Sequence, residues 1–125
     1  MYKYSTVIII DDSEMDLYLC KTILGSLNYA KSIITYTNPG EALKYFKQLD
    51  LEKDIPELVF LDINMPIMNG FDFLKEVDSL HEKIKTKVKY YVISSSEDLE
   101  DIEKINAYPN IIKYLYKPLK KADIN

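Results

Sequence analysis

The pattern of apolar and polar residues predicts strands that are buried on both faces. Residues 58–61 are four consecutive apolar residues that end on Asp62, whereas a half-exposed strand would alternate apolar and polar positions. Residues 7–10 form a similar β-branched run, which ends on Asp11 and Asp12. Segments rich in β-branched and aromatic residues predict three further strands, over residues 32–37, 88–93 and 111–116.

Apolar residues at helical spacing fill the intervals between these strands. The first helix is predicted over residues 14–27 after the capping Ser13, and the second opens at Asn38-Pro39-Gly40. A third helix follows Gly70 and fades within residues 81–87. The buried faces are expected to comprise Met15, Leu19, Ile23 and Leu27 in the first helix; Ala42, Leu43, Phe46 and Leu49 in the second; Phe71, Leu74, Val77 and Leu80 in the third; and Leu99, Ile102 and Ile105 in the fourth.

Alternation of five strands with helices predicts a doubly wound α/β fold. Its sheet would be parallel, with right-handed crossovers and helices on both faces. The common strand order for five strands is 2-1-3-4-5, which places the first and third strands side by side at the switch point. A chain of 125 residues fits one domain, so we expect residues 1–125 to form a single unit.

Composition excludes several function classes. The net charge is −4, and all 16 basic residues are lysines, so the bidentate arginine contacts that read nucleic acids are missing. No apolar run approaches the ~20 residues that span a bilayer, and the first residues do not resemble a signal peptide. The single Cys20 forms no internal disulfide and is expected to be a small buried residue. We therefore expect a cytoplasmic protein that binds neither membranes nor nucleic acid.

Residues with complementary chemistry follow four of the five predicted strands. In the expected strand order, Asp11, Asp12, Asp62, Ser94 and Lys117 converge on one edge of the sheet. Three neighbouring carboxylates repel one another, which a divalent cation with oxygen ligands, most naturally Mg²⁺, would relieve. Lysine and a hydroxyl suit phosphoryl oxygens. The set predicts a phosphoryl-accepting site in which Asp62 is the nucleophile and forms an acyl phosphate.

Each of these residues also has a simpler interpretation when it is taken alone. Asp11 and Asp12 are suited to the positive end of the first helix, and Ser94 to a helix cap. Asp62 fits a turn, and Lys117 fits an exposed surface position. These interpretations do not explain why four strand ends carry complementary groups at once.

The ordered motifs resemble those of the receiver domain of bacterial two-component response regulators. The matching segments are the aspartate pair at 11–12, FLDINMPIMNG at 60–70, VISSS at 92–96 and YKP at 116–118. The resemblance covers essentially the whole chain and implies a flavodoxin-like fold of strand order 2-1-3-4-5. It also implies a phosphoacceptor signalling module that is not itself an enzyme, although it assists its own phosphorylation and dephosphorylation.

The resemblance implies specific roles for the residues at the sheet edge. Asp62 corresponds to the phosphorylated aspartate, and Mg²⁺ would be held by Asp12, Asp62 and the backbone carbonyl of Asn64. Asp11 would contact the metal through water. Ser94 corresponds to the hydroxyl that contacts the phosphoryl group, and Lys117 to its ion-pair partner.

Further positions correspond to switching and tuning residues of the family. Tyr114 is similar to the switch aromatic, which turns inward when Ser94 moves toward the phosphoryl group. Asn64 and Ser96 lie where residues tune the lifetime of the acyl phosphate. The Lys117-Pro118 bond is cis in most members. The implied partners are a histidine kinase or histidine phosphotransfer protein and an unidentified downstream protein.

One feature departs from the family pattern. Only residues 119–125 remain for the fifth helix, so we expect it to be short or truncated. A short helix would expose part of the sheet and lower stability. It also weakens any argument for dimerisation through this face, so we expect a monomer or weak dimer.

Three alternative functions remain open at this point. A haloacid-dehalogenase-like phosphatase also forms an aspartyl phosphate, but it needs an aspartate two residues after the nucleophile, where Asp62 is followed by Asn64 and Asp11 by Ser13. In a flavin-binding flavodoxin, the carboxylates at 11–12 would repel the flavin phosphate. A degenerate receiver would bind proteins without being phosphorylated.

Overall fold

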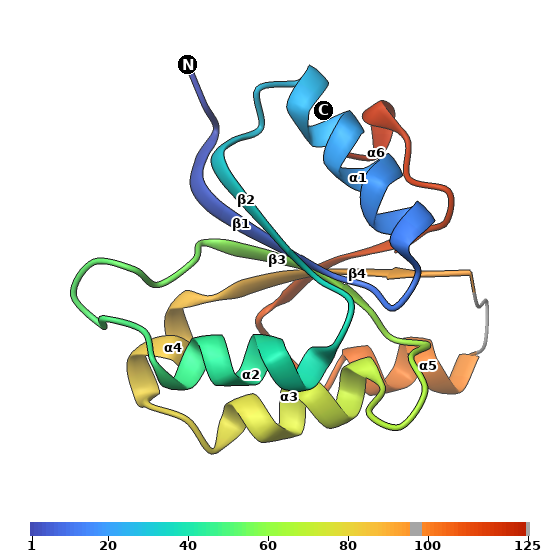
Figure 1. Cartoon of the computed structure of the whole chain (residues 1–125). Helices are drawn as coiled ribbons and strands as arrows, with labels where there is room; N and C mark the ends of the chain where they lie inside the picture. Colours follow the sequence, from blue (N-terminus) through green and yellow to red (C-terminus); the bar gives the residue numbers. More distant parts are fainter. Residues whose placement is uncertain (96–98, 125) are drawn as a thin grey trace.

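A five-stranded parallel sheet forms the centre of the molecule in the computed structural model, which describes residues 1–95 and 99–124 (Figure 1). The strand order is β2-β1-β3-β4-β5, and every neighbouring pair is parallel. Both features confirm the predicted topology. The strands are β1 (Tyr4–Ile10), β2 (Ala30–Tyr36), β3 (Leu58–Asp62), β4 (Lys89–Ser94) and β5 (Ile111–Tyr116).

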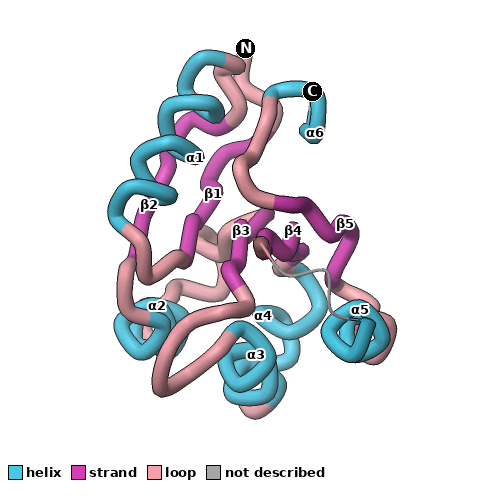
Figure 2. Tube along the Cα trace, turned by 90° about the vertical axis from the view of Figure 1, so that its right-hand side faces the viewer, coloured by secondary structure: helices cyan, strands magenta, loops and turns pink. Residues whose placement is uncertain are grey.

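Helices cover both faces of this sheet, as predicted (Figures 1 and 2). One face carries α1 (Glu14–Ser26) and the short α6 (Lys121–Ile124). The other carries α2 (Pro39–Lys47), α3 (Gly70–Asp78), α4 (Glu82–Lys87) and α5 (Leu99–Ile105). Each layer encloses its own core of apolar side chains.

The position of β3 at the centre of the sheet explains why its sequence is a continuous apolar run. All five of its residues are buried, because β1 and β4 flank it and helices cover both of its faces. Val59 and Leu61 pack in the core beneath α2 and α3, whereas Leu58 and Phe60 pack in the core beneath α1. A strand in this position buries every side chain, which accounts for the continuous apolar run.

The buried face of α1 differs from the predicted one. Met15 is 72% exposed and Leu19 is 45% exposed, whereas Leu17, Cys20 and Leu24 are buried. Successive residues spaced by four are rotated by about 40° around a helix, so the four predicted residues do not all lie on one face and the first of them point toward solvent. Leu17, Cys20 and Leu24 are spaced by three and then four residues, which keeps them on the face toward the sheet. The predicted burial of Cys20 is confirmed.

The helix α4 was not predicted. It spans six residues where the sequence indicated that helical structure fades, and His81 caps it by accepting a hydrogen bond from the Lys83 amide on Nδ1 (3.1 Å). Only Ile84 of this helix is buried. A single apolar residue gives no periodicity, and histidine is not among the preferred capping residues, so the sequence carried little signal.

The remaining predicted helices form with smaller differences. In α2 the predicted face is buried at Ala42, Leu43 and Phe46, while Leu49 is half-buried beside it. In α5 the predicted residues Ile102 and Ile105 are half-buried. No helix in the described part of the chain is long and apolar enough to cross a bilayer.

The C-terminal helix α6 is short, as predicted, but the sheet beneath it is covered. Ile124 is 2% exposed and packs in the same core as Leu115 and Tyr91, which are also buried. The Lys113 ammonium lies 5.4 Å from the centre of the Tyr91 ring and donates a hydrogen bond to the Asp123 carbonyl (3.2 Å). The expected exposure of this part of the sheet is therefore wrong.

Candidate functional site

Three carboxylates meet at the carboxyl edge of the sheet. Asp62 is the last residue of β3, and Asp11 and Asp12 directly follow β1, which pairs with β3. One oxygen from each of the three groups lies within 4.8 Å of the others. Asp11 and Asp62 are buried, whereas Asp12 is exposed. The sequence predicted this convergence.

Local turns fix the two buried carboxylates. The Ser13 amide donates to Oδ1 of Asp11 (2.9 Å), and the Asn64 amide donates to Oδ1 of Asp62 (3.0 Å). Each bond closes a short turn from an aspartate to the amide two residues later. In both aspartates Oδ1 is occupied by this bond, which leaves Oδ2 to face the other charged groups.

The loop after Asp62 returns tightly onto the end of its own strand. A Cβ atom on Gly70 would lie 2.7 Å from the Ile63 Cα, so only glycine fits there. Neither Asn69 nor Gly70 adopts a positive φ. Ile67 does so instead (φ 67°), while Asn69 caps α3 through reciprocal hydrogen bonds with Asp72.

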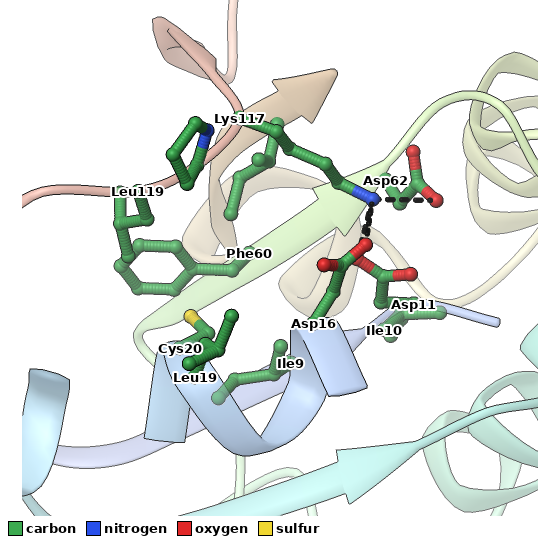
Figure 3. A pocket seen from close by; sticks show the side chains of 12 residues that line it. Ile9, Ile10, Asp11, Asp16, Leu19, Cys20, Phe60, Asp62, Lys117 and Leu119 are labelled. Carbon is green, nitrogen blue, oxygen red and sulfur yellow. Dashed lines mark hydrogen bonds and ion pairs between the residues drawn. The ribbon is translucent and has the colours of Figure 1, made fainter. Parts of the chain in front are cut away.

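Lys117 connects the carboxylates of the site (Figure 3). Its ammonium Nζ lies 2.8 Å from Oδ2 of Asp16, 2.9 Å from Oδ2 of Asp11 and 3.4 Å from Oδ2 of Asp62. The Lys117 amide donates to the Ser94 carbonyl (2.9 Å), and the following bond to Pro118 is cis, as the resemblance implied. These contacts aim the lysine from the end of β5 across the sheet edge.

Asp16 is the residue that the sequence analysis missed. It lies in the first turn of α1, with its side chain 36% exposed, and it makes the shortest contact with Lys117. The spacing carried a usable signal, because Asp16 is four residues after Asp12 and a helix that starts between them turns it back toward the same edge.

Burial controls the protonation of the central pair. It raises the pKa of Asp62 to about 6, and the negative charge of Asp11 adds to this increase. The hydrogen bond from the Asn64 amide and the positive charge of Lys117 both act to lower the pKa. Burial alone would lower the pKa of Lys117, but its hydrogen bonds with Asp16 and Asp11 and the charge of Asp62 raise that pKa overall. The lysine is therefore a permanent cation beside a carboxylate that titrates near neutrality.

The predicted hydroxyl is completely buried at the end of β4. Ser94 has an exposed fraction of 0%, and its Oγ accepts a hydrogen bond from the side-chain amide of Asn64 (2.6 Å). The resemblance implied a backbone metal contact and a tuning role for Asn64, but not this hydrogen bond. The hydrogen bond joins the acidic loop to the hydroxyl on the neighbouring strand.

The predicted switch residue Tyr114 lies on the same side of the sheet as Ser94. Ser94 pairs with Tyr116, Val92 pairs with Tyr114, and residues two apart on a strand share a face. Tyr114 is half-buried, and its ring packs edge-on against that of Tyr116, with 5.1 Å between ring centres. The predicted tuning residue Ser96 lies outside the described residues.

The donor set fits a hard divalent cation. All donors offered by Asp11, Asp12 and Asp62 are carboxylate oxygens, and only one cation, Lys117, contacts the two buried groups in the described structure. Oxygen ligands of this kind suit Mg²⁺ or Ca²⁺ rather than metals that prefer nitrogen or sulfur.

A small cavity of about 30 Å³ lies beneath the charged cluster (Figure 3). Its walls include Ile9, Cys20, Phe60 and Leu119, so the charges rest on an apolar floor. Burial raises the pKa of the Cys20 thiol to about 12, which leaves it protonated and unreactive. The cysteine therefore contributes packing beneath the site, as predicted.

Comparisons with known proteins agree on one family. The family model described as the response regulator receiver domain matches residues 7–125. The chain is 33% identical over 79 residues to chemotaxis protein CheY of Thermotoga maritima, and this match covers 63% of this chain and 61% of that protein. It is 28% identical over 114 residues to the probable C4-dicarboxylate response regulator DctR of Bacillus subtilis, which covers 91% of this chain and 46% of that protein. The chain thus spans less than two thirds of the length of these relatives.

Solved structures give the same result. A two-component response regulator from Cytophaga hutchinsonii superposes with a TM-score of 0.89 at 28% identity, over 98% of this chain and 92% of that one. A response regulator receiver protein from Dyadobacter fermentans superposes with a TM-score of 0.84 at 31% identity, over 96% and 91% of the two chains. The likeness therefore extends over the whole fold.

Proposed function

Because the chain belongs to the response regulator receiver domain family, we propose that it accepts a phosphoryl group on Asp62 from a phosphohistidine donor in the cytoplasm. The observation that carries this proposal is the cluster itself, in which a buried carboxylate at a strand end faces Lys117 and two further carboxylates. Residues 1–125 would act as one receiver unit in a two-component phosphorelay.

The transfer needs an ionised Asp62. One carboxylate oxygen attacks the phosphorus of phosphohistidine, the new P–O bond forms, and the P–N bond breaks as the imidazole leaves with the electron pair. The pKa of about 6 leaves Asp62 mostly ionised at neutral pH. The Lys117 ammonium is placed to stabilise the negative charge on a phosphoryl oxygen.

Mg²⁺ is the metal that we propose for the acidic cluster. Asp12, Asp62 and the backbone carbonyl of Asn64 would hold it, with Asp11 acting through water. When bound, Mg²⁺ would supply positive charge that offsets the repulsion between the carboxylates and the incoming phosphoryl group.

Lys117 must change partners during the reaction. Its closest contacts are to Asp16 and Asp11, while Asp62 is 3.4 Å away. A phosphoryl group on Asp62 adds acceptor oxygens and negative charge next to this ammonium. We propose that the phosphoryl group draws Lys117 away from Asp16, so Asp16 stabilises the unphosphorylated arrangement.

The switch would begin at the Asn64–Ser94 hydrogen bond. The Ser94 oxygen accepts the hydrogen bond from the Asn64 amide, and toward a phosphoryl oxygen the same hydroxyl would act as a donor. We propose that the movement of Ser94 toward the phosphoryl group stretches its bond to Asn64. Tyr114 is one diagonal position away on the same face of the sheet and is only half-buried, so it can move into the space that Ser94 leaves.

Exposed apolar residues beside the site suit a phosphodonor protein. On α1, Met15 and Tyr18 are 72% and 70% exposed, and Leu19 lies near Asp16 at the site (Figure 3). Apolar side chains gathered beside a reactive carboxylate are typical of a protein interface. We propose this face of α1 as the docking surface for a histidine kinase or histidine phosphotransfer protein.

A second apolar stripe suits the downstream protein. On the edge strand β5, Tyr116 is 46% exposed and shares a face with Tyr114, and Ile112, at the register shift between β4 and β5, is 53% exposed. A change at Tyr114 would therefore alter this surface directly. No observation favours the phosphatase alternative, because the residue two positions after Asp62 is an amide bonded to Ser94.

Intact mass measurement after incubation with acetyl phosphate tests the proposal. The wild-type chain should gain one phosphoryl group only when Mg²⁺ is present, and Asp62→Asn should gain none. Asp12→Asn should require more Mg²⁺ for the same gain. Absence of any gain in a folded wild-type chain with Mg²⁺ would favour the degenerate receiver, which signals without phosphate.

A further inference from the structure

The start of α1 carries the exposed apolar residues of the proposed docking surface. Met15 and Tyr18 are exposed there, and among residues 14–17, which form the first turn, Leu17 is the buried one. Apolar packing therefore holds this turn through a single side chain. The other contacts that fix the start of the helix are polar, so the position of the docking surface depends on them.

Two polar links join the start of α1 to the acidic cluster. In the first, the Ser13 amide donates to Oδ1 of Asp11 (2.9 Å), and the Ser13 hydroxyl oxygen accepts from the Asp16 amide (3.2 Å). In the second, Nζ of Lys117 lies 2.8 Å from Oδ2 of Asp16. The same Nζ lies 2.9 Å from Oδ2 of Asp11, so both links lead to groups that surround Asp62.

The ion pair lies where the packing between α1 and the strand ends is incomplete. Asp16 and Lys117 both line the cavity of about 30 Å³, whose walls also include Cys20 of α1 and Leu119 beyond β5 (Figure 3). Well-packed interiors contain few voids that could hold a water molecule, so the side chains around this one make fewer contacts than core residues do. The ion pair therefore contributes a large share of what holds the first turn in place.

The same ion pair lies at the boundary between protein and solvent. The Lys117 side chain is 19% exposed and that of Asp16 is 36% exposed. An ion pair at such a position is weaker than a buried one, and its partners can be exchanged at small cost. These properties suit a contact that forms in one state of the chain and breaks in the other.

A phosphoryl group on Asp62 would compete for the same ammonium. Nζ of Lys117 is already 3.4 Å from Oδ2 of Asp62, so a small movement brings it onto a phosphoryl oxygen attached there. The phosphoryl group carries more negative charge than the Asp16 carboxylate and offers three acceptor oxygens. Once Lys117 has moved, the first turn of α1 keeps only the link through Ser13.

On the basis of the proposed phosphorylation of Asp62, we propose that the Asp16–Lys117 ion pair makes the docking surface on α1 respond to phosphorylation. In the unphosphorylated chain the pair holds the first turn, so Met15 and Tyr18 are presented in a fixed arrangement. After transfer the turn opens more often, and a donor that binds must first order it again. The phosphodonor protein therefore binds the unphosphorylated chain more tightly and leaves once the transfer is complete.

Amide exchange with water, followed by NMR, tests whether the ion pair holds the first turn. The Leu17 amide donates to the Ser13 carbonyl (3.0 Å), so its exchange reports the opening of this turn. In the unphosphorylated chain, Asp16→Asn should exchange this amide about threefold to fivefold faster than the wild type after correction for intrinsic rates, as the loss of one partly exposed ion pair implies. Glu14→Gln removes one charge from the same turn and should leave the exchange unchanged.

Phosphorylation of the wild type should have the same effect as Asp16→Asn. When intact mass shows the gain of one phosphoryl group from acetyl phosphate and Mg²⁺, the Leu17 amide should exchange about threefold to fivefold faster than before. Phosphorylated Asp16→Asn should show no further increase. The Leu24 amide, in the buried part of α1, is the internal reference and should not change in any of these chains.

The outcomes distinguish a failure of the ion pair from a failure of the phosphoryl chemistry. A wild type that gains no phosphoryl group would overturn the proposed function and with it the response to phosphorylation, while unphosphorylated Asp16→Asn would still show whether the ion pair holds α1. The proposal is overturned if Asp16→Asn exchanges the Leu17 amide at the wild-type rate, or if Glu14→Gln accelerates it equally. It is also overturned if the wild type gains a phosphoryl group without faster exchange, or if Asp16→Asn responds to phosphorylation as strongly as the wild type.

Discussion

At the scale of single residues, Lys117 and its three carboxylates decide how the site behaves. One ammonium contacts Asp16, Asp11 and Asp62 within 3.4 Å, so the positive charge is shared among more acceptors than it can neutralise. Any group that adds negative charge beside Asp62 competes with Asp16 for this lysine. This competition leads to two predictions that can be measured on the isolated chain.

The first prediction concerns Asp16→Asn. With the negative charge of Asp16 removed, Lys117 is held less tightly and is more available to an incoming phosphoryl group. Phosphorylation by acetyl phosphate below saturation should become roughly threefold to tenfold faster, as the loss of about 1 kcal/mol of competing interaction implies. The effect should appear in the half-saturating concentration of acetyl phosphate and not in the maximal rate.

Glu14→Gln is the matched control for this variant. Glu14 lies in the same first turn of α1 and is exposed. Glu14→Gln removes one negative charge, as Asp16→Asn does, but leaves the contacts of Lys117 unchanged. Asp16→Glu keeps the carboxylate and should phosphorylate as slowly as the wild type. Equal acceleration by Glu14→Gln and Asp16→Asn would show that net charge, and not the contact with Lys117, is responsible.

The second prediction concerns stability without metal. The folded-state pKa of Asp62 is raised from 3.8 to about 6, so the folded state binds the proton more tightly than the unfolded state. Ionised Asp62 therefore destabilises the fold; this destabilisation is absent below pH 4, develops between about pH 4 and 6 and is complete above that range. Asp62→Asn should raise the free energy of unfolding at pH 7 by about 1 to 2 kcal/mol in EDTA.

Urea unfolding of both proteins from pH 4 to 8 checks this expectation. The difference in free energy of unfolding between Asp62→Asn and wild type should grow between pH 4 and 6 and then stay constant. Added Mg²⁺ should stabilise the wild type more than the variant. A difference that does not change with pH would mean that Asp62 titrates normally in the fold.

At the scale of elements, the loop between β3 and α3 is the most constrained segment of the site. Gly70 leaves no room for a side chain, because a Cβ atom would meet the backbone of Ile63 at 2.7 Å and that of Asp62 at 2.9 Å. Gly70→Ala should therefore shift the strand end that carries Asp62. We expect a loss of about 1 to 3 kcal/mol in the free energy of unfolding, together with slower phosphorylation.

Thermal unfolding and the acetyl phosphate assay measure the two effects of Gly70→Ala. The matched control is Gly25→Ala in α1, where a Cβ atom would meet no neighbour within 4 Å. That substitution should raise stability slightly, since alanine is favoured over glycine within a helix. Equal stability of wild type and Gly70→Ala would contradict the steric account of this loop.

The elements also show how far the sequence alone could lead. The runs in β1 and β3 were predicted because burial on both faces requires unbroken apolar residues, and β3 has such a run in full. The edge strands β2 and β5 are partly exposed and were predicted from their β-branched and aromatic residues. The predicted buried face of α1 was wrong because residues spaced by four do not stay on one side of a helix. The helix α4 was missed because only one of its residues, Ile84, is buried. Weak periodicity is the common cause of both errors.

The site, like the elements, was predicted only in part from the sequence. Asp62, Lys117 and Ser94 were predicted because strand order alone brings strand ends together. The Asp16 contact and the Asn64–Ser94 hydrogen bond depend on side-chain directions, which periodicity does not fix.

At the scale of the whole molecule, the charged residues that we propose for phosphoryl transfer gather at one edge of the sheet. The central strand β3, which leads to this edge, is buried throughout its length. A change at the carboxyl edge can therefore occur without rebuilding the core.

The most direct test of the account is chemical identification of the phosphorylated residue. The chain is incubated with acetyl phosphate and Mg²⁺, reduced with sodium borohydride and sequenced by tandem mass spectrometry, because borohydride converts an acyl phosphate on aspartate to homoserine. The account predicts homoserine at position 62 and unchanged aspartate at positions 11, 12 and 16. Homoserine at any of those three positions, or at none despite Mg²⁺ and a folded chain, would contradict it.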